Sequence, residues 1–249
     1  MKRRDFVAGV IGGAAGAVAL ERLRPGRPQT VREFGRVSYS EQGEDIALYH
    51  AVHDLLGIDR PTFMDLGAAH PVRSNNTFLL YESGSSGLLV EPNPMYVAML
   101  RRERPKDRVL AAGIGVTDAV EADYYEIKEN PLLNTFSPEQ VAVLQKGRAE
   151  SVVARVSRMP LININRAIAD HLGKAPDLLS TDIEGLDADI IRSLDLTRFR
   201  PGVICCEGVS LFKGGNTSYI AQYLVPRGYI LRGGSMVNSI FVDGTRVEA

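Results

Sequence analysis

Short apolar runs alternate along the chain with segments whose apolar residues recur every three or four positions. The runs have the length of strands, and the periodic segments have the spacing of helices. From Val37 onward this alternation predicts an α/β protein with a mostly parallel sheet and helices on both faces. We predict strands over 62–66, 87–90, 108–112, 121–127, 151–156, 177–181 and 201–206, and helices over 44–56, 77–82, 94–103, 164–172, 187–194 and 219–224.

Two further apolar runs, over 229–232 and 239–242, lie close together near the end of the chain. Strands joined by so short a connection pair antiparallel, because parallel neighbours need a long crossover. We therefore expect an antiparallel hairpin to close the chain. In sheets of this kind ligands bind at the carboxyl ends of the strands, where the strand order reverses.

The first 36 residues differ from the rest in charge, with eight basic and three acidic residues in a chain whose net charge is −1. Residues 1–20 open with Lys2-Arg3-Arg4 and continue as a Gly/Ala-rich apolar run, too short for a confident transmembrane helix. The pattern matches an export signal of the twin-arginine kind or, alternatively, a membrane-surface anchor or tail. Residues 21–36 have the composition of a linker, so residues 37–249 form the domain.

The overall composition narrows the classes of function. A net charge of −1 argues against general nucleic-acid binding. The apolar fraction of 45% is ordinary for a globular protein with a real core. The two cysteines, Cys205 and Cys206, are adjacent in an apolar run. Neighbours on a strand point to opposite faces, so we predict two buried thiols rather than a disulfide.

The stretch 63–71, FMDLGAAHP, places a single glycine directly after a predicted strand. Gly67 permits a tight turn and the close approach of a ligand to the backbone. A dinucleotide-binding turn would need further glycines where Ala69 and Val72 stand, and no Walker phosphate loop follows a strand. The turn therefore predicts a cofactor that lacks a pyrophosphate.

Two carboxylates accompany this turn: Asp65 just before Gly67, and Glu91 at the end of the next predicted strand. A carboxylate repels a pyrophosphate and attracts a cation, and an acid at a strand end can accept hydrogen bonds from both hydroxyls of a ribose. S-adenosyl-L-methionine combines a ribose with ammonium and sulfonium groups. The two acids therefore favour this cofactor, and the alternative is a pair of solvated acids in an unrelated α/β fold.

Several motifs together resemble the FkbM-type methyltransferases, from about Val37 to about Val242. They are YSEQGED over 39–45, DLGAAHP over 65–71, SNNT over 74–77, EPNP over 91–94, NTF over 134–136 and STDIEGLD over 180–187. The resemblance implies a Rossmann-like class I methyltransferase, with a seven-stranded sheet into which the last hairpin inserts an antiparallel strand. It also implies O-methylation of a hydroxyl group on a sugar, a glycan or a related natural product.

The resemblance further implies which residues hold the cofactor. Asp65 and Gly67 would lie against its methionine part, and Glu91 against its ribose. The other expected cofactor-binding residues are Ala68, Pro92, Gly113 and Asp182.

Two positions depart from the family's pattern. The family usually has Tyr-Ser-Gln-x-Gly-Glu-Asp, whereas Glu41 here precedes Gln42, and Ala69 stands where a second histidine is common. Both departures leave the cofactor acids in place and bear on the substrate end. They keep open a second class of function, a non-catalytic module that binds cofactor or glycan without turnover.

Methyl transfer to an alcohol needs help from a general base, which accelerates such reactions by roughly 10²–10⁴. Asp182 and Glu184 follow the predicted strand 177–181 and are the preferred catalytic candidates, with His70 second. The alternatives are an acid pair stabilised by the dipole of helix 187–194, and packing of His70 within its loop.

Two more polar residues belong to the predicted substrate end. Glu207 follows the predicted strand 201–206, and we expect it to line the substrate cleft. A substrate-binding role for Asn134 is implied by the resemblance alone.

Other chemistries fit the sequence less well. His50 and His53 lie about one helical turn apart without an obvious third ligand, so we predict no metal site. A magnesium ion held by cleft carboxylates stays open, because Mg²⁺ needs only one or two of them. Tyr124 and Lys128 have the spacing of a short-chain dehydrogenase pair, but they fall on a predicted strand and the glycine fingerprint is missing.

The cofactor conflicts with the export pattern of residues 1–20. S-adenosylmethionine is made and kept in the cytoplasm, so an exported enzyme would lack its methyl donor. We therefore predict a cytoplasmic domain that the N-terminal segment attaches to the inner face of a membrane, with export by a twin-arginine-like signal as the alternative. The expected partner is a small-molecule or glycan acceptor.

Overall fold

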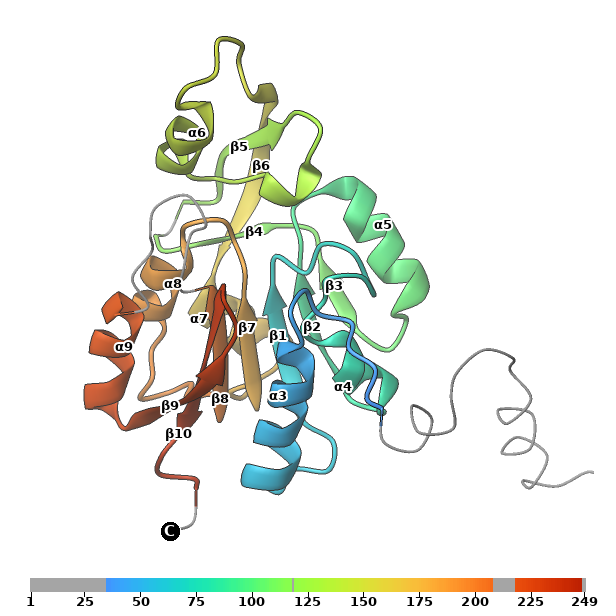
Figure 1. The fold of residues 1–249 in the computed structure, drawn as a ribbon, viewed down its shortest axis with the longest axis vertical. Coiled ribbons are helices and arrows are strands. Elements are labelled where there is room, and N and C mark those ends of the chain that lie inside the picture. The colour runs from blue at the N-terminus through green and yellow to red at the C-terminus, as the bar shows by residue number, and fades with distance from the viewer. Residues whose placement is uncertain (1–34, 118, 208–217, 248–249) are drawn as a thin grey trace, which may run out of the picture. The chain divides into compact units, whose positions relative to one another are not determined.

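A seven-stranded sheet forms the centre of the protein, in a computed structural model that describes residues 35–117, 119–207 and 218–247 (Figure 1). The order across the sheet is β3 (Arg108–Leu110), β2 (Ser86–Val90), β1 (Thr62–Leu66), β7 (Leu178–Thr181), β8 (Val203–Glu207), β10 (Asn238–Asp243) and β9 (Tyr229–Gly234). β10 runs antiparallel to both of its neighbours, and the pairings β3–β2, β2–β1, β1–β7 and β7–β8 are parallel. This order confirms the predicted α/β class and the inserted antiparallel strand.

The chain divides into one unit of residues 1–37 and a second of residues 38–249, and the architecture described here is that of the second. The predicted signal-like segment 1–20, and residues 21–34 of the predicted linker, lie outside the described residues. Among the helices of the described part, none is long and apolar enough to span a bilayer.

Helices cover both faces of the sheet, and each face has its own hydrophobic cluster. One cluster joins Leu48, Leu80 and Leu100 from three helices to strand residues such as Phe63. These helices are α3 (Glu44–His50), which continues as the π-helical turn η1 (Ala51–Leu55), α4 (Phe78–Glu82) and α5 (Pro94–Glu103). The opposite cluster includes α7 (Ile164–His171), α8 (Asp187–Ser193) and α9 (Ser218–Leu224), which is followed by the 3₁₀ turn η3 (Val225–Arg227).

The strand order reverses beside β1. The chain steps outward from β1 to β2 and β3, and it re-enters the sheet on the other side of β1 as β7. A crevice therefore opens at the carboxyl ends of β1 and β7, which is where open α/β sheets bind their ligands.

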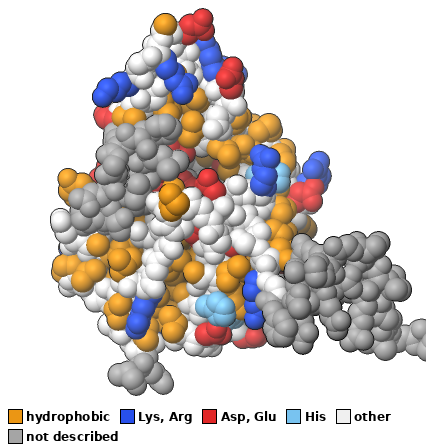
Figure 2. Space-filling view, in the orientation of Figure 1, with side chains coloured by type: hydrophobic (Ala, Val, Ile, Leu, Met, Phe, Trp, Pro, Cys, Tyr) orange, Lys and Arg blue, Asp and Glu red, His pale blue; other side chains and the backbone are white. Residues whose placement is uncertain are grey.

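A second, three-stranded sheet lies between β3 and β7 in the sequence and extends beyond the carboxyl end of the main sheet (Figure 1). Charged side chains gather on its outer tip (Figure 2). Within this sheet Arg158 forms exposed ion pairs with Glu121 and Asp123. Its elements are β4 (Gly113–Gly115), β5 (Glu121–Ile127), η2 (Pro131–Leu133), α6 (Pro138–Gln145) and β6 (Val153–Asn163).

The sequence predicted this region least well. The prediction over 151–156 covers only the first part of β6, because Pro160 interrupts the apolar pattern, and β4 and α6 were not predicted. A local signal for α6 was present, however. Ser137 caps the helix by accepting a hydrogen bond from Gln140 N at 3.1 Å, and Pro138 occupies its first turn.

Candidate functional site

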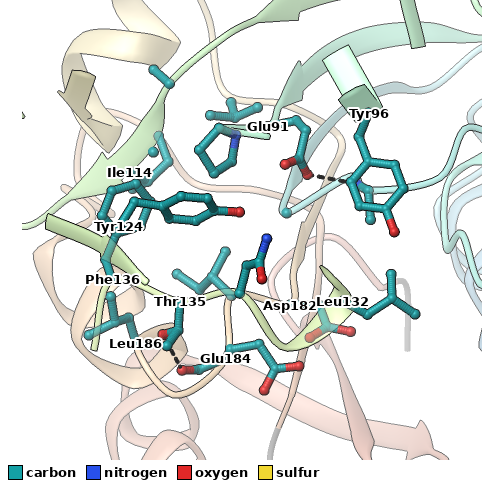
Figure 3. Close-up of a pocket in the computed structure, with 18 of the residues that line it drawn as sticks. Glu91, Tyr96, Ile114, Tyr124, Leu132, Thr135, Phe136, Asp182, Glu184 and Leu186 are labelled. Atoms are coloured by element: carbon teal, nitrogen blue, oxygen red, sulfur yellow. Dashed lines mark hydrogen bonds between the residues drawn. The ribbon is translucent and has the colours of Figure 1, made fainter. Parts of the chain in front are cut away.

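A cleft of about 570 Å³, partly open to solvent, lies at the carboxyl ends of β1, β2 and β7 and beneath the three-stranded sheet (Figure 3). Of the predicted site residues, those that line the cleft are Gly67, Glu91, Pro92, Gly113, Asp182 and Glu184. The predicted residues Asp65, Ala68 and His70 are not among the lining residues.

Gly67 brings the ends of β1 and β7 together. Its φ of +78° lies in the left-handed region. A Cβ at this position would lie only 2.1 Å from the carbonyl oxygen of Asp182. Only glycine fits both conditions, so the turn's shape and its contact with β7 have the same cause.

Glu91 is the acid at the ribose end of the predicted site. It is 4% exposed, its Oε2 accepts from Ala69 N at 2.9 Å, and its Oε1 accepts from Asn93 N at 2.7 Å. Burial raises the pKa of Glu91 to about 7, against the lowering effect of those two amides. A carboxylate has about four lone-pair sites, so each oxygen can still accept one more hydrogen bond from a ligand.

Asp65 and Ala68 lie beneath the turn rather than on the cleft wall. Asp65 is 4% exposed, and its Oδ2 accepts from Thr77 Oγ1 at 2.7 Å. Burial raises the pKa of Asp65, while Thr77 and the nearby Arg104 oppose the shift. Ala68 packs in the hydrophobic core. Cofactor contact by these two residues therefore stays a prediction.

His70 organises its own loop. Its Nδ1 accepts from the backbone N–H groups of Val72 at 3.1 Å and Arg73 at 3.0 Å. Burial, followed by the charge of Arg73, lowers the pKa of the imidazole. These contacts favour the alternative of loop packing over a role as general base.

The turn after β7 brings three carboxylates together. Asp182 opens into the cleft but is otherwise surrounded by protein, and burial followed by the charges of Asp187 and Glu184 raises its pKa well above the ordinary value. The pKa of Glu184 is raised to about 7 by burial and by Asp187, although Gln140 Nε2 donates to its Oε2 at 3.3 Å. Both acids lie at the lower edge of the cleft in Figure 3.

Asp187 is the acid at the start of α8. The alternative interpretation of Asp182 and Glu184 had given those two residues this position. Asp187 is the first residue of α8, is 3% exposed and accepts a hydrogen bond from Thr181 Oγ1. Backbone N–H groups of the turn lower its pKa, but burial outweighs them and raises it to about 6. Asp182 and Glu184 precede the helix and are left facing the cleft.

Glu207 and Glu41 extend this acidic group. Glu207 ends β8, and its pKa is raised to about 9, first by burial and then by the charges of Asp182, Asp187 and Glu184. Glu41 acts on Asp182, Glu184 and Glu207 in the same direction. We had predicted from the sequence that Glu207 lines the cleft, but neither Glu207 nor Glu41 is among the lining residues.

An apolar and aromatic wall closes the opposite side of the cleft, and the sequence did not predict it. Tyr124 and Phe136 pack with ring centroids 4.9 Å apart (Figure 3). A Cβ on Gly113 would lie 2.4 Å from the Phe136 ring, so this wall requires glycine there. Tyr96 and Leu132 also line the cleft, on the side away from Tyr124 and Phe136 in Figure 3. Asn134, also on the cleft, accepts from Ile127 N at 2.7 Å and so holds the loop in place.

The YSEQGED motif ties the N-terminal end of the domain to the final hairpin. Glu44 is 2% exposed, and its Oε1 accepts from Ser235 Oγ at 2.6 Å and from Asn238 Nδ2 at 3.2 Å. The displaced amide of Gln42 accepts from Met236 N at 2.9 Å. Gln42 therefore has a structural role. Glu41, the other residue of this motif that differs from the family's pattern, raises the pKa values of the acids near the cleft.

Within the part of the chain that the structure describes, no group of three or more His, Cys, Asp or Glu side chains is arranged to hold a metal ion. His50 pairs with Asp54 on the same helix. Cys205 and Cys206 are buried free thiols on opposite faces of the sheet, as predicted.

Comparison with known proteins identifies the family. A family model, the Methyltransferase FkbM domain, matches residues 65–231. No curated protein matches the chain significantly.

Three solved structures are similar at low identity. One is a putative caffeoyl-CoA O-methyltransferase from Staphylococcus aureus, with 8% identity, 92% of this chain and 98% of that chain covered, and a TM-score of 0.45. The second is a TehB-like SAM-dependent methyltransferase from Corynebacterium glutamicum, with 11% identity, 92% and 98% covered, and a TM-score of 0.40. The third is the Burkholderia thailandensis 1,6-didemethyltoxoflavin-N1-methyltransferase with bound 1,6-didemethyltoxoflavin and S-adenosylhomocysteine, with 11% identity, 95% and 93% covered, and a TM-score of 0.41.

The family model covers more than half of the chain, including the turn after β1, the aromatic wall and the acids after β7. The chain therefore belongs to the FkbM methyltransferase domain family and is an S-adenosylmethionine-dependent methyltransferase.

Proposed function

We propose that the protein transfers the methyl group of S-adenosylmethionine to a hydroxyl oxygen of an uncharged sugar, glycan or related natural product. The observation that carries this proposal is the division of the cleft. Glu91, Tyr96 and Tyr124 lie toward one end of the cleft, and Asp182 and Glu184 lie toward the other (Figure 3).

The first side suits a nucleoside. Glu91 has free acceptor sites for ribose hydroxyls, and Tyr96, Tyr124 and Phe136 offer apolar surface for a base. Gly67 and Gly113 leave space where any side chain would clash. When bound, the cofactor supplies a methyl group already activated by its sulfonium leaving group, so positioning contributes much of the rate.

The second side suits removal of a proton. An alcohol is a poor nucleophile at neutral pH, and Asp182 or Glu184 would accept its proton as the hydroxyl oxygen bonds to the methyl carbon. A base is most effective when its pKa is near the working pH. Desolvation and the charges of neighbouring carboxylates raise the pKa values of Asp182 and Glu184 above those of ordinary carboxyl groups, and that of Glu184 to about 7.

The charge of the lining favours an uncharged acceptor. Among the described residues, those that line the cleft include Glu91, Asp182 and Glu184 but no Lys, Arg or His. Like charges in a site of low dielectric disfavour a wrong partner. We therefore expect neutral hydroxyl compounds to be methylated in preference to carboxylated or phosphorylated analogues.

Two measurements test this function. Calorimetric titration with S-adenosylmethionine and with NAD should show binding of the first only, weakened in Glu91→Ala by roughly tenfold or more, since hydrogen bonds to charged groups contribute about 1.5–3 kcal/mol. Transfer of a labelled methyl group should then be seen with neutral sugars and be weaker with uronic acids. Cofactor binding without transfer to any hydroxyl compound would instead support the non-catalytic module.

We also propose that the domain works in the cytoplasm, attached to the inner face of a membrane by residues 1–20. The support is the basic, Gly/Ala-rich composition of that segment and the cytoplasmic supply of the cofactor. Cell fractionation tests it, and a processed, soluble protein outside the cytoplasm would contradict it.

A further inference from the structure

Arg104 lies beneath the turn after β1 and has no role in the methyl transfer proposed above. Arg104 follows α5, and its side chain is completely buried. Its Nε donates to Asp107 Oδ2 at 2.7 Å, in an ion pair in which neither side chain is exposed. The guanidinium lies over the rings of Phe63, Phe78 and Tyr81, at 5.0–6.0 Å from their centroids. Burying a charge so completely is unfavourable unless its donors are satisfied.

The remaining donors of Arg104 point toward the turn after β1. Nη1 donates to Asn75 Oδ1 at 3.0 Å, and the Asn75 amide in turn donates to the carbonyl oxygens of Ala68 at 3.0 Å and His70 at 3.2 Å. Asn75 thereby holds Ala69 from both sides. Two successive hydrogen bonds therefore link Arg104 to the turn, the second of them made to both Ala68 and His70. The backbone N–H of Ala69, between those two residues, donates to Glu91.

A second arm leads to Asp65. Both Nη1 and Nη2 of Arg104 donate to Thr77 Oγ1 at 3.1 Å, and the Thr77 hydroxyl donates to Asp65 at 2.7 Å. Asp107, the ion-pair partner, accepts from Gly87 N at 2.8 Å and so connects the same group to β2. Arg104 thus joins the turn after β1, the carboxylate of Asp65 and the strand that carries Glu91.

The conformation of Ala69 shows why such support is needed. Its φ is +46°, a left-handed value that a residue with a side chain adopts only at a cost. A strained residue keeps its conformation only when surrounding contacts impose it. The Asn75 amide on both flanks and Glu91 on the N–H are those contacts, and the charged fork of Arg104 fixes the Asn75 side chain.

We infer that Arg104 is a positioning residue for cofactor binding, acting through Asn75 on the Ala69–Glu91 contact and through Thr77 on Asp65. The inference rests on the proposed assignment of Glu91 to the cofactor. Lysine at position 104 would keep the charge but lose the planar fork that reaches three partners at once.

Calorimetric titration of the full chain with S-adenosylhomocysteine tests this inference. Arg104→Lys and Asn75→Ala should each raise the Kd by roughly tenfold, the size of coupling carried through a hydrogen-bonded network. Thr77→Val should raise the Kd less. It removes the hydroxyl that contacts Asp65 and Asn75, but Asn75 Oδ1 still accepts from Arg104 Nη1 and from the backbone N–H of residue 77. Thermal melts of each variant show how much of the change is loss of stability.

Arg200→Lys is the matched control. Arg200 also forms a hydrogen-bonded ion pair, donating to both oxygens of Asp243 at 2.8 Å, but at the amino ends of the parallel strands. It should lower the Tm and leave the Kd for S-adenosylhomocysteine unchanged.

Variants of Arg104, Asn75 and Thr77 that lower the Tm with an unchanged Kd would overturn the inference, since a purely structural role has that signature. If Arg104→Lys does not fold, Asn75→Ala and Thr77→Val decide in the same way. Failure of hydroxyl methylation with intact cofactor binding would overturn only the proposed function.

Discussion

Two turns at the carboxyl edge of the sheet are accompanied by acids with raised pKa values, and they differ in how those acids are balanced. Asp65 is buried on β1, just before the first turn, whereas Asp182 and Glu184 lie in the turn after β7, the first exposed and the second partly buried. Each turn also holds one residue other than glycine at positive φ, Ala69 at +46° and Glu184 at +55°. The first acid has a hydroxyl and a guanidinium nearby, whereas the acids of the second have mostly one another.

The difference separates positioning from proton chemistry. A cation and fixed hydrogen-bond donors hold a carboxylate in one place and oppose the effect of burial on its pKa. Neighbouring carboxylates have the opposite effect, because like charges favour the protonated state and bring the pKa toward neutrality. We therefore propose that the first turn holds the shape of the cofactor site and that the second accepts a proton during the reaction.

The largest effect should come from neutralising the second turn. Asp182→Asn or Glu184→Gln, whichever is the base, should lower kcat by roughly 10²–10⁴, while affinity for S-adenosylhomocysteine changes little. Labelled methyl transfer and calorimetry measure the two quantities. Asp189→Asn is the control and should behave as wild type, because Asp189 is an exposed acid on α8, the helix that follows the turn. If neither cleft variant lowers kcat, the second turn has no role in proton transfer.

The contact between the two turns should be next in size. In Gly67→Ala the new Cβ would collide with the Asp182 carbonyl oxygen, and overpacking of this kind destabilises by about 1–3 kcal/mol beyond the strain of a positive φ. Gly57→Ala controls for that strain, because Gly57 has a φ of +64° with nothing within 4 Å of the added atom. Urea denaturation should show a larger loss at position 67. Equal losses of unfolding free energy in the two variants would mean that the ends of β1 and β7 can separate to accommodate the added Cβ.

The acids of the second turn should also make stability depend on pH. The pKa of Glu184 is raised from 4.5 to about 7, so between these values the folded protein binds more protons than the unfolded chain. The free energy of unfolding should therefore fall as pH rises from about 4.5 to about 7. Glu184→Gln should reduce this slope in urea titrations, whereas Glu150→Gln should not. A slope unaffected by Glu184→Gln would indicate an ordinary, solvated carboxylate.

The smallest effect concerns Glu41. Its charge helps to raise the pKa values of Asp182 and Glu184, so Glu41→Gln should lower them. The base would then be ionised at lower pH, and the acid limb of the pH–rate profile should move down by a few tenths of a pH unit, as expected for a screened charge. If the acid limb of the profile does not move and kcat is unchanged, the charge of Glu41 does not affect the pKa of the base.

Much of the main sheet follows from local pattern. β1 and α5, which packs on the main sheet, occur at the residues predicted, because strand and helix periodicity and the proline at position 94 act over a few residues. In the second sheet β5 also occurs where it was predicted. The roles of Gly67 and Glu91 as cleft residues also followed from their places at strand ends. The three-stranded sheet was only partly predicted, since β4 is short and β6 contains a proline.

The sequence by itself determined the α/β class, the family, the glycine turn and the acids at the strand ends. Only the tertiary structure decided which acids face the cleft, because Asp65 and Asp182 look alike in sequence and differ in their neighbours. It also decided that Tyr124 meets Phe136 and that Arg104 reaches Asn75 and Thr77. The physical reason is range: backbone periodicity is set by adjacent residues, whereas burial, charge balance and pKa depend on residues that folding brings together from distant parts of the chain.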